Sequence, residues 1–457
     1  MSIESGQEHA YDRDTRQIDP SIWEDEARFK ELCETAHPAE VAEGLGEVDS
    51  ERVAELLRVL EPTKRAEVFS NLNADKQADL VELLNKNELA VVLQKMPPDE
   101  RADVFNFLSD EMREDVLPLL ARAEREDILR LGSYEEGTAG AVMTSDYATL
   151  DPKLTIREAI DRLRLEAPRR ETIYNAYVID SQRRLIGVVS LRDLILASPS
   201  KRVEEIMKTD VIFARVTDSQ EEVAKKFSKY DLLALPIVNG GDALVGIVTV
   251  DDVLDVTEEE ATTDFQLMGS SAPIGVSVKE AGLFLLFKKR IPWLLVLVFM
   301  NVLSGAGIAL FQDVIGQVVT LVLFLPLILG SGGNAGSQSA TLMVRALATG
   351  DVRLRDWFEL LGREILVAFA LGFVMAIAVS SFGFFRAGRE VTMVVAIAMI
   401  AVVMFGSLMG MLLPFIFTRF KMDPATASAP LITSLTDVAG VIIYFSIAKW
   451  YLFYWNA

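Results

Sequence analysis

The stretch L-P-L-I-L-G-S-G-G-N-A-G-S-Q-S-A-T-L-M-V-R, from Leu325 to Arg345, decides how the rest of this chain is interpreted. It continues an apolar run that starts at Ile315 but then becomes rich in glycine and polar side chains. Lipid cannot hydrogen-bond freed peptide groups, so such a stretch is tolerated at bilayer depth only where it packs in protein or lines a watery cavity. We therefore predict a polar, Gly-rich break in a membrane span and a pore wall lined by Gly330, Gly333, Asn334, Gly336 and Gln338.

A second polar site lies in the last apolar segment, where Asp437 stands within L-I-T-S-L-T-D-V-A-G-V-I-I-Y-F. A carboxylate near the bilayer centre costs roughly 2.5 to 3.5 kcal/mol on insertion scales, so it is a poor choice for a lipid-facing position. We interpret Asp437 as a cation-binding residue of the pore, together with Asn334, and assign Thr433 to the pore lining.

Charge separates the 457 residues into two parts. Between Ile291 and Ala457, 9 basic residues stand against 8 acidic ones. Because the whole chain has 45 basic and 66 acidic residues, residues 1–290 hold 36 and 58 of them, a net charge of −22. The length exceeds one typical domain, and the composition mixes two classes. We expect an acidic soluble region followed by a membrane region.

The reactive side chains are few. Cys33 is the single cysteine, and His9 and His37 are the two histidines. This composition excludes an internal disulfide framework and makes a thiolate cluster, a His-based zinc site or a catalytic triad hard to build. The polar, acidic first residues contain no signal-peptide core, so we expect the soluble region to remain in the cytosol. We do not expect an enzyme.

Residues 1–22 are polar and unpatterned, and we expect a disordered tail. Residues 23–131 have helical periodicity and a partial repeat, in which P-T-K-R-A-E-V-F-S-N-L from Pro62 matches P-D-E-R-A-D-V-F-N-F-L from Pro98. Each proline is suited to the first turn of a helix. We predict a small all-α superhelical domain of stacked helix pairs. It acts either as a docking module or as an acidic sensor with Asp99 and Asp103 as candidates.

Residues 132–260 change to an α/β pattern that occurs twice, at about 138–199 and 200–260. Gly187 aligns with Gly246, Ser190 with Thr249, and Asp193 with Asp252. This resembles a tandem CBS (cystathionine-β-synthase type) pair, a regulatory module whose G-h-h-S/T-x-x-D ending commonly lies near a ribose. The resemblance implies a possible nucleotide site, with ATP as the candidate, at Ser190, Asp193 and Thr249. The alternative is a structural dimerisation pair.

An acidic run follows the second copy and contains Asp252, Asp255, Glu258 and Glu259. Asp252, Asp255 and Glu259 share one helix face, where like charges repel unless a cation bridges them. A solvated charge run is the simpler alternative. Residues 261–290 are expected to form a linker and an amphipathic connecting helix, opened by a capping box at Ser277 and Glu280.

Five apolar segments make up residues 291–457, and several exceed the roughly 20 residues that span a bilayer. Basic residues before the first span and after the second and fourth predict that these flanks are cytosolic. We therefore expect a multi-pass protein of the cytoplasmic (inner) membrane with its N-terminus inside and its C-terminus outside. The predicted spans are about Ile291–Phe311, Ile315–Val344, Ile365–Phe385, Val391–Phe417 and Ala425–Trp450.

This order of domains, together with P-x-x-x-G-x-x-G-N-x-G-x-Q in the second span and D-P-A…P-L-I-T-S-L-T-D-V-A-G in the last, resembles the MgtE magnesium channels. The resemblance implies a homodimer with a central Mg²⁺-selective pore that closes when cytosolic Mg²⁺ is high. It places Asp437 at the pore carboxylate and the regulatory Mg²⁺ at Asp252, Asp255 and the acidic run from Glu258. It does not assign the sensor residues of the helical domain one by one.

Magnesium chemistry agrees with this resemblance, because Mg²⁺ is usually held by one or two carboxylates with waters retained. Two alternatives remain for the membrane part. Asp437 would serve equally well as a proton or Na⁺ site in a coupled transporter, whereas a membrane-anchored nucleotide sensor would leave the intramembrane polar residues unexplained. Asn334 and Gln338 could also serve as interhelical hydrogen-bonding groups. The expected partners are a second copy, the bilayer and magnesium ions, with no nucleic acid.

Overall fold

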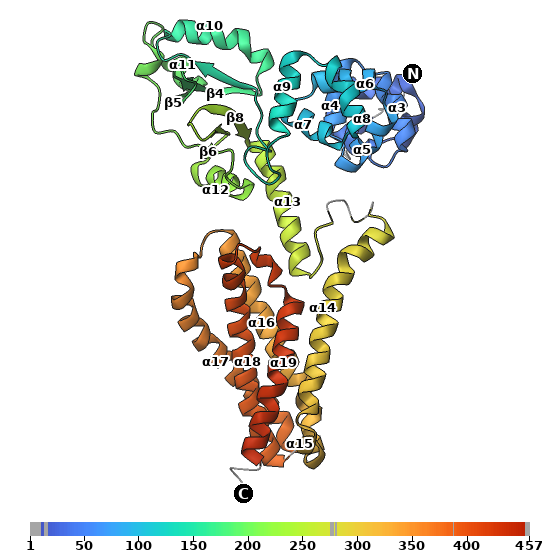
Figure 1. The fold of residues 1–457 in the computed structure, drawn as a ribbon, viewed down its shortest axis with the longest axis vertical. Helices are drawn as coiled ribbons and strands as arrows, with labels where there is room; N and C mark the ends of the chain where they lie inside the picture. Colours follow the sequence, from blue (N-terminus) through green and yellow to red (C-terminus); the bar gives the residue numbers. More distant parts are fainter. Residues whose placement is uncertain (1–10, 13–16, 275–277, 279–280, 387, 453–457) are drawn as a thin grey trace, which may run out of the picture. The chain divides into compact units, whose positions relative to one another are not determined.

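The computed structural model describes residues 11–12, 17–274, 278, 281–386 and 388–452. It divides into two compact units, Met1–Thr257 and Glu258–Ala457, and helix α13 (Val250–Met268) crosses the division. The first unit holds the helical domain and the α/β pair, and the second holds the membrane helices (Figure 1). Each unit is described by itself.

The first helical domain is a superhelix in which each helix contacts the next but one along the chain, from α2 with α4 to α7 with α9. Its elements are η1 (Pro20–Glu24), α1 (Glu26–Thr35), α2 (Pro38–Leu45), α3 (Ser50–Arg58), α4 (Pro62–Ser70), α5 (Ala74–Leu83), α6 (Lys86–Lys95), α7 (Pro98–Phe107), α8 (Asp110–Val116), η2 (Leu117–Leu119) and α9 (Arg122–Leu131). The superhelical fold class is thereby confirmed.

Local sequence explains where these helices begin. Pro62 and Pro98 occupy first-turn positions of α4 and α7, as predicted, and the side chains of Asp49 and Asn73 accept backbone hydrogen bonds at the starts of α3 and α5. Two expectations are corrected. The 36-residue repeat contains three short helices, α4 to α6, instead of a helix pair. The predicted tail is structured towards its end, because Ile22 is fully buried in the core of this domain; residues 1–10 and 13–16 lie outside the described residues.

A short antiparallel pair, β1 (Tyr11–Asp12) with β2 (Gln17–Ile18), precedes the helices. The α/β region contains two three-stranded sheets, β3-β4-β5 and β6-β7-β8, each with one parallel and one antiparallel pairing. Their elements are β3 (Tyr147–Leu150), α10 (Ile156–Glu166), η3 (Ala167–Arg169), β4 (Thr172–Ile179), β5 (Leu185–Ser190), α11 (Leu191–Leu196), η4 (Val203–Glu205), β6 (Ala214–Arg215), α12 (Gln220–Tyr230), β7 (Ala234–Val238) and β8 (Leu244–Thr249).

The two halves of this pair exchange their leading segments. Thr144, ahead of the first sheet, pairs with Ile247 in the second, and Lys208, ahead of the second sheet, pairs with Val188 in the first. The aligned glycines leave room for the exchanged segments, because a Cβ on Gly246 would lie 2.5 Å from the Met143 sulfur. The two copies of the sequence repeat therefore form two similar halves, and each half pairs its leading segment with the sheet of the other.

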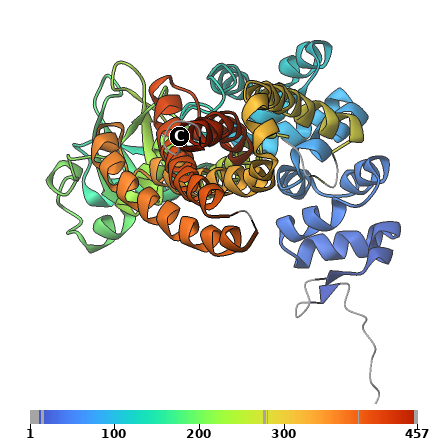
Figure 2. The ribbon, with the colours of Figure 1, turned by 90° about the horizontal axis from the view of Figure 1, so that it is seen from below.

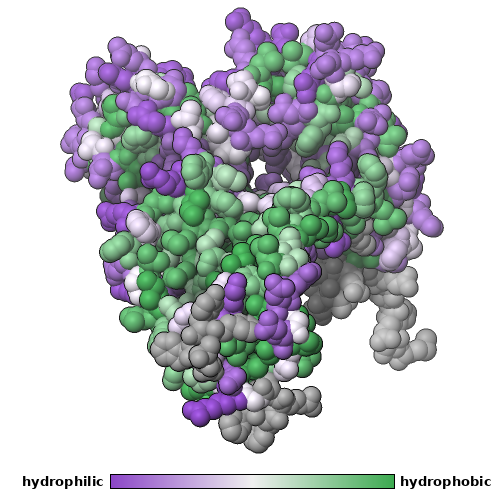
Figure 3. Space-filling view, turned by 60° about the horizontal axis from the view of Figure 1, so that its bottom comes forward, coloured by the Kyte–Doolittle hydropathy of each residue, from purple (hydrophilic) through white to green (hydrophobic). Residues whose placement is uncertain are grey.

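Among its described residues, the second unit contains five helices long and apolar enough to cross a membrane, as expected. Its elements are α14 (Leu283–Ala309), α15 (Gln312–Gln317), η5 (Val319–Phe324), α16 (Leu325–Ala348), η6 (Leu354–Asp356), α17 (Trp357–Arg386), α18 (Gly388–Arg419), η7 (Pro424–Thr426) and α19 (Ala429–Trp450). Helix α18 contacts α16, α17 and α19, and α19 also contacts α14. Figure 2 shows these helices nearly end-on, and Figure 3 shows the broad apolar surface that they expose.

Two predictions about the membrane helices are corrected. The span containing Leu325–Arg345 has no break at its glycines, because α16 is a continuous helix; the irregular backbone precedes it, in η5. The Leu321 carbonyl of η5 accepts a hydrogen bond from the buried Tyr444 hydroxyl at 2.9 Å, which satisfies a peptide group that lipid could not. In addition, α14 continues without interruption from Leu283 through the expected connecting segment into the first span. The predicted cap at Ser277 and Glu280 lies outside the described residues.

Candidate functional site: a carboxylate in a membrane-spanning helix and an acidic cluster in the first unit

The glycines of α16 allow very close helix contacts. A Cβ on Gly406 of α18 would lie 2.2 Å from the Gly332 carbonyl oxygen, and one on Gly410 would lie 2.0 Å from that of Gly336. Both distances are far below van der Waals contact, so only glycine permits this approach. On the α19 side, Gly333 packs against Thr433. Gly333, Gly336 and Thr433 thus form helix contacts within one chain.

The remaining polar residues of α16 are arranged differently. Gly330, Asn334 and Gln338 recur at four-residue spacing, and all three are exposed on one face of the helix. The structure records no hydrogen bond of the Asn334 or Gln338 side chain to another described residue. The interhelical hydrogen bonds expected as one alternative are therefore not formed among the described residues.

Contacts between α16 and the antiparallel α19 set the depth of Asp437. Leu329 meets Gly440, whereas Gly333 meets Thr433 one helical turn before Asp437. This register places Asp437 between those two levels, beside residues 330–333 of α16. Asp437 is half-buried, and no described Lys or Arg forms an ion pair with it. The carboxylate predicted from the sequence thus lies at the same depth as the start of the exposed polar face.

Sequence reasoning did not single out Glu364, another carboxylate within a membrane-spanning helix. Glu364 of α17 accepts a hydrogen bond from the buried Ser407 hydroxyl of α18. In the sequence, Glu364 directly precedes the predicted third span, which begins at Ile365, so its position indicates a flanking residue; α17 begins earlier, at Trp357, and includes it. Its hydrogen bond links α17 to α18.

A second cluster of carboxylates lies in the first unit, where α7 meets the start of α13. Ala102 of α7 and Val253 of α13 belong to one buried apolar cluster. Asp99 and Asp103 flank Ala102 along α7, and Asp252 precedes Val253. Apolar packing therefore forces acidic side chains from two separate predicted domains towards each other. The cluster consists of Asp99, Glu100, Asp103, Glu171, Asp251, Asp252 and Asp255.

The pKa values of these carboxyl groups show that it is unfavourable to hold them buried and ionised close together. Burial, followed by the negative charges of Asp252 and Glu100, raises the pKa of Asp99 well above its ordinary value. Burial and nearby carboxylates raise the pKa of Asp103 to about 6 and that of Glu171 to about 7. In each case the charges acting on the group are negative, so protons or cations are needed to relieve the repulsion.

Two oxygen atoms of the cluster also lack hydrogen bonds. Asp99 Oδ1 and Glu100 Oε2 are buried without a partner among the described residues. However, no three His, Cys, Asp or Glu side chains in the described part of the chain are close enough together to hold one metal ion.

The predicted regulatory residues separate into two groups. Asp99, Asp103, Asp252 and Asp255 belong to the acidic cluster, whereas Glu258 and Glu259 are exposed on later turns of α13. Glu171 was missed because it lies at the start of β4, far in sequence from both acidic segments. Glu100 also belongs to the cluster, but the sequence offers several neighbouring carboxylates around Asp99 and does not indicate which of them face α13.

The predicted nucleotide residues have local structural roles. The Ser190 hydroxyl donates to Asp193 Oδ2 at 2.7 Å and accepts from the Asp193 amide at the start of α11. At the start of α13, the Thr249 hydroxyl donates to Asp252 Oδ2 at 2.5 Å, and the Thr249 amide donates to the same oxygen at 3.2 Å. In both halves the S/T-x-x-D ending therefore links the residue before a helix to an aspartate in its first turn, but the backbone hydrogen bonds differ.

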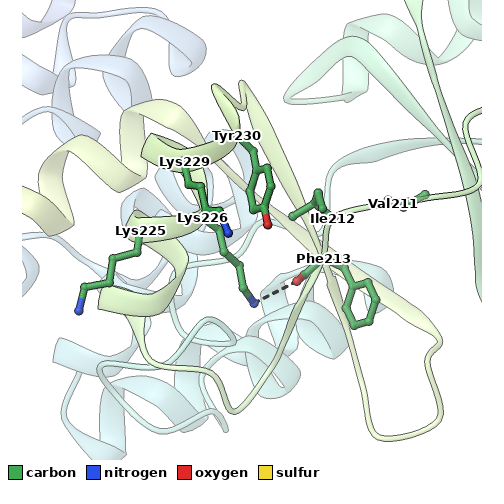
Figure 4. Close-up of a pocket in the computed structure, with 7 residues that line it drawn as sticks. All are labelled: Val211, Ile212, Phe213, Lys225, Lys226, Lys229 and Tyr230. Atoms are coloured by element: carbon green, nitrogen blue, oxygen red, sulfur yellow. Dashed lines mark hydrogen bonds between the residues drawn. The ribbon is translucent and has the colours of Figure 1, made fainter. Parts of the chain in front are cut away.

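A cavity of about 380 Å³ lies in the second half of the pair (Figure 4). Its lining combines the segment before β6 with the basic face of α12. Lys226 donates to the Phe213 carbonyl and pairs with Asp218, and Lys225 pairs with Glu221. Two of its three lysines are thus already neutralised. The lining residues are Val211, Ile212, Phe213, Lys225, Lys226, Lys229 and Tyr230, which include none of the predicted nucleotide residues.

Family models agree with this organisation. Residues 36–137 match the MgtE intracellular N domain, residues 139–200 and 203–259 match CBS domains, and residues 325–447 match MgtE, described as a divalent cation transporter. Fold and family models together define a multi-pass membrane transporter that carries a CBS pair. Members of this class move ions and are not enzymes.

Curated relatives named magnesium transporter MgtE include one from Thermus thermophilus, 41% identical over 319 residues, which cover 70% of this chain and 71% of the relative. Another, from Bacillus subtilis, is 36% identical and covers 70% of each chain. The chain therefore belongs to the MgtE family.

Two solved structures are also similar. A crystal structure of the soluble part of a magnesium transporter is 33% identical, has a TM-score of 0.49, and covers 53% of this chain and 96% of its own. The cytosolic domain of the Mg²⁺ channel MgtE in complex with ATP is 38% identical, with a TM-score of 0.49, and covers 51% of this chain and 95% of its own.

Proposed function

We propose that this protein is a Mg²⁺-selective channel of the cytoplasmic membrane, built as a homodimer and closed by cytosolic Mg²⁺. Residues 291–457 conduct, residues 23–131 and 132–260 sense Mg²⁺, and residues 261–290 connect the two regions. The N-terminus lies in the cytosol and the C-terminus outside. Family membership supports transport of Mg²⁺, and the remaining points rest on the chemistry of the two sites.

The observation that carries the proposal is the depth of Asp437 beside the exposed polar face of α16. Asn334 and Gln338 are exposed within a membrane-spanning helix, where contact with lipid would leave their amides unsatisfied. A second copy that covered this face would enclose the polar residues around an axis. Two Asp437 carboxylates would then balance the charge of one hydrated Mg²⁺.

The acidic cluster supplies the proposed gate. Without metal, repulsion among its carboxylates favours separation of α7 from α13, and Mg²⁺ favours their approach. A ligand shifts such an equilibrium only by its difference in affinity for the two states. Several weak sites in each dimer could together supply the few kcal/mol that closure requires. Because α13 continues into the second unit, a movement of α13 can reach the pore.

We also propose that the CBS pair binds a nucleotide. Ser190, Asp193 and Thr249 form hydrogen bonds at the starts of two helices, but their hydroxyl and carboxylate oxygens retain further acceptor capacity. ATP would bias the same equilibrium as Mg²⁺.

The decisive experiment is planar-bilayer recording of the full-length protein with Mg²⁺ as the permeant cation and with no proton or Na⁺ gradient. Unitary Mg²⁺ currents are expected, and they should disappear in Asp437→Asn and persist in Asp313→Asn, which changes an exposed carboxylate of α15. Transport that requires a proton or Na⁺ gradient would instead indicate a coupled transporter.

The homodimer has a separate test. In a Cys33→Ser background, Asn334→Cys should form a disulfide-linked dimer under mild oxidation, whereas Phe373→Cys, on the exposed face of α17, should not. Equal cross-linking of both variants, or of neither, would contradict a two-copy pore along α16.

A further inference from the structure

A groove of about 350 Å³ lies at the end of α18, and none of the carboxylates described above lines it. One wall comes from η6 and the first turn of α17, and the other comes from the last two turns of α18. Five of its six lining residues are apolar, and Trp357 is 43% exposed. The lining residues are Leu354, Trp357, Leu412, Phe415, Ile416 and Arg419.

The groove is supported by its own small core. Met343 of α16 packs with Met411 and Phe415 of α18, and this cluster is separate from the main core of the membrane unit. Phe415 is buried and belongs to both the cluster and the groove wall. The groove is therefore held by packed helices and does not depend on a loose surface loop.

Arg419 gives the groove one charged end. It is exposed, and no described carboxylate forms an ion pair with it. Two nearby carboxylates are already engaged, since Asp356 pairs with Arg355 and Glu359 pairs with Arg363. The guanidinium of Arg419 therefore remains available for an anion from outside the chain.

We propose that this groove binds an acidic phospholipid, with an acyl chain along Leu354, Trp357 and Ile416 and the phosphate on Arg419. Guanidinium groups bind phosphate through paired, charge-assisted hydrogen bonds. Both walls belong to helices that qualify as membrane spans, so lipid chains are the apolar molecules at hand. A tryptophan at the end of a span is also typical of the lipid–water interface.

A lipid explains the combination better than free phosphate does. Phosphate alone would use Arg419 and leave the apolar walls without an occupant. A lipid fills both parts, and it would bind η6 and α18 together. Because such a ligand stabilises the state that it binds, the groove offers a route by which membrane composition adjusts the arrangement of α17 and α18.

Native mass spectrometry of the delipidated full-length protein tests this inference. The probes are phosphatidylglycerol, phosphatidylcholine with the same acyl chains, and glycerol 3-phosphate. The wild type should retain phosphatidylglycerol about fivefold better than phosphatidylcholine, as expected for one basic residue at an anionic membrane surface. Glycerol 3-phosphate should not compete.

The variants locate the site. Arg419→Gln should remove the preference for phosphatidylglycerol, and Ile416→Trp, which fills the groove, should reduce retention of both lipids. Arg389→Gln changes an exposed arginine at the other end of α18 and should behave as the wild type. Equal retention of the two lipids by the wild type, an unchanged preference in Arg419→Gln, or displacement by glycerol 3-phosphate would overturn the proposal.

Discussion

Ser270 and Ser428 are joined by a hydrogen bond in which their Oγ atoms lie 2.6 Å apart, and both residues are buried. Ser270 follows α13, which carries Asp252 at its beginning. Ser428 directly precedes α19, which carries Asp437. This contact lies within the second unit and links the end of the acidic helix to the start of the helix with the intramembrane carboxylate.

The first prediction tests this link. Ser428→Ala removes one hydrogen bond, worth roughly 0.5 to 1.5 kcal/mol, between the proposed sensor and the pore helix. We expect the Mg²⁺ concentration for half-closure to rise by about two- to tenfold, while the current of open channels is unchanged. Ser381→Ala, which alters a hydroxyl bonded within its own helix, is the control. If the Mg²⁺ concentration for half-closure is unchanged in Ser428→Ala, this contact does not take part in gating.

The second prediction separates the two groups of predicted regulatory residues. The double substitution Asp99→Asn and Asp103→Asn should raise the closing Mg²⁺ concentration about tenfold, equivalent to roughly 1.4 kcal/mol, because it removes charge from the acidic cluster. Glu258→Gln with Glu259→Gln changes the same number of charges on exposed turns and should have little effect. A larger effect of the Glu258 and Glu259 pair would place the regulatory ion further along α13. Patch recording over a range of cytosolic Mg²⁺ concentrations measures both.

The third prediction concerns pH. Asp103 and Glu171 have pKa values raised to about 6 and about 7 in the folded unit, above the 3.8 and 4.5 of ordinary carboxyl groups. Between about pH 4 and 7 the folded unit therefore binds more protons than the unfolded chain, and the free energy of unfolding falls as pH rises. This contribution is complete below about pH 4 and is lost as pH rises through the folded pKa values.

Hydrogen exchange of α7 and α13 in the metal-free full-length protein measures this change. After correction for intrinsic rates, protection should decrease from about pH 5 to about pH 7.5. Millimolar Mg²⁺ at the higher pH should restore protection, because cations replace the lost protons. Protection that increases with pH in metal-free protein would contradict a strained carboxylate cluster.

The fourth prediction concerns packing of the membrane helices. Gly410→Ala would place a methyl group 2.0 Å from the Gly336 carbonyl oxygen. We expect it to lower stability by about 1 to 3 kcal/mol, as overpacking usually does. Gly305→Ala, in a position where a Cβ meets nothing within 4 Å, should change stability by less than about 1 kcal/mol. Thermal unfolding in detergent measures the difference, and equal melting temperatures would show that α16 and α18 can separate without cost.

Local sequence predicts where many of the helices begin and which segments can span a membrane. Pro62 and Pro98 begin helices because proline fits the first turn, and the five apolar segments are long enough to span a bilayer. The two S/T-x-x-D endings identify the repeat, because each places a hydroxyl within hydrogen-bonding distance of an aspartate in the first turn of a helix. The position of Asp437 near the middle of its apolar segment also follows from sequence, since a helix rises by a constant distance per residue, whereas the contacts with α16 place it beside residues 330–333.

The roles of the glycines in helix packing, and the membership of the acidic cluster, depend on tertiary structure. Gly332 and Gly336 form no break in α16, because their partners Gly406 and Gly410, more than seventy residues later, allow the helices to touch. Glu171 belongs to the acidic cluster and Glu259 does not, although Glu259 is the one that lies in a run of acidic residues in the sequence. Helical spacing specifies which side chains share a face, but packing between distant elements, here Ala102 with Val253, determines which faces meet.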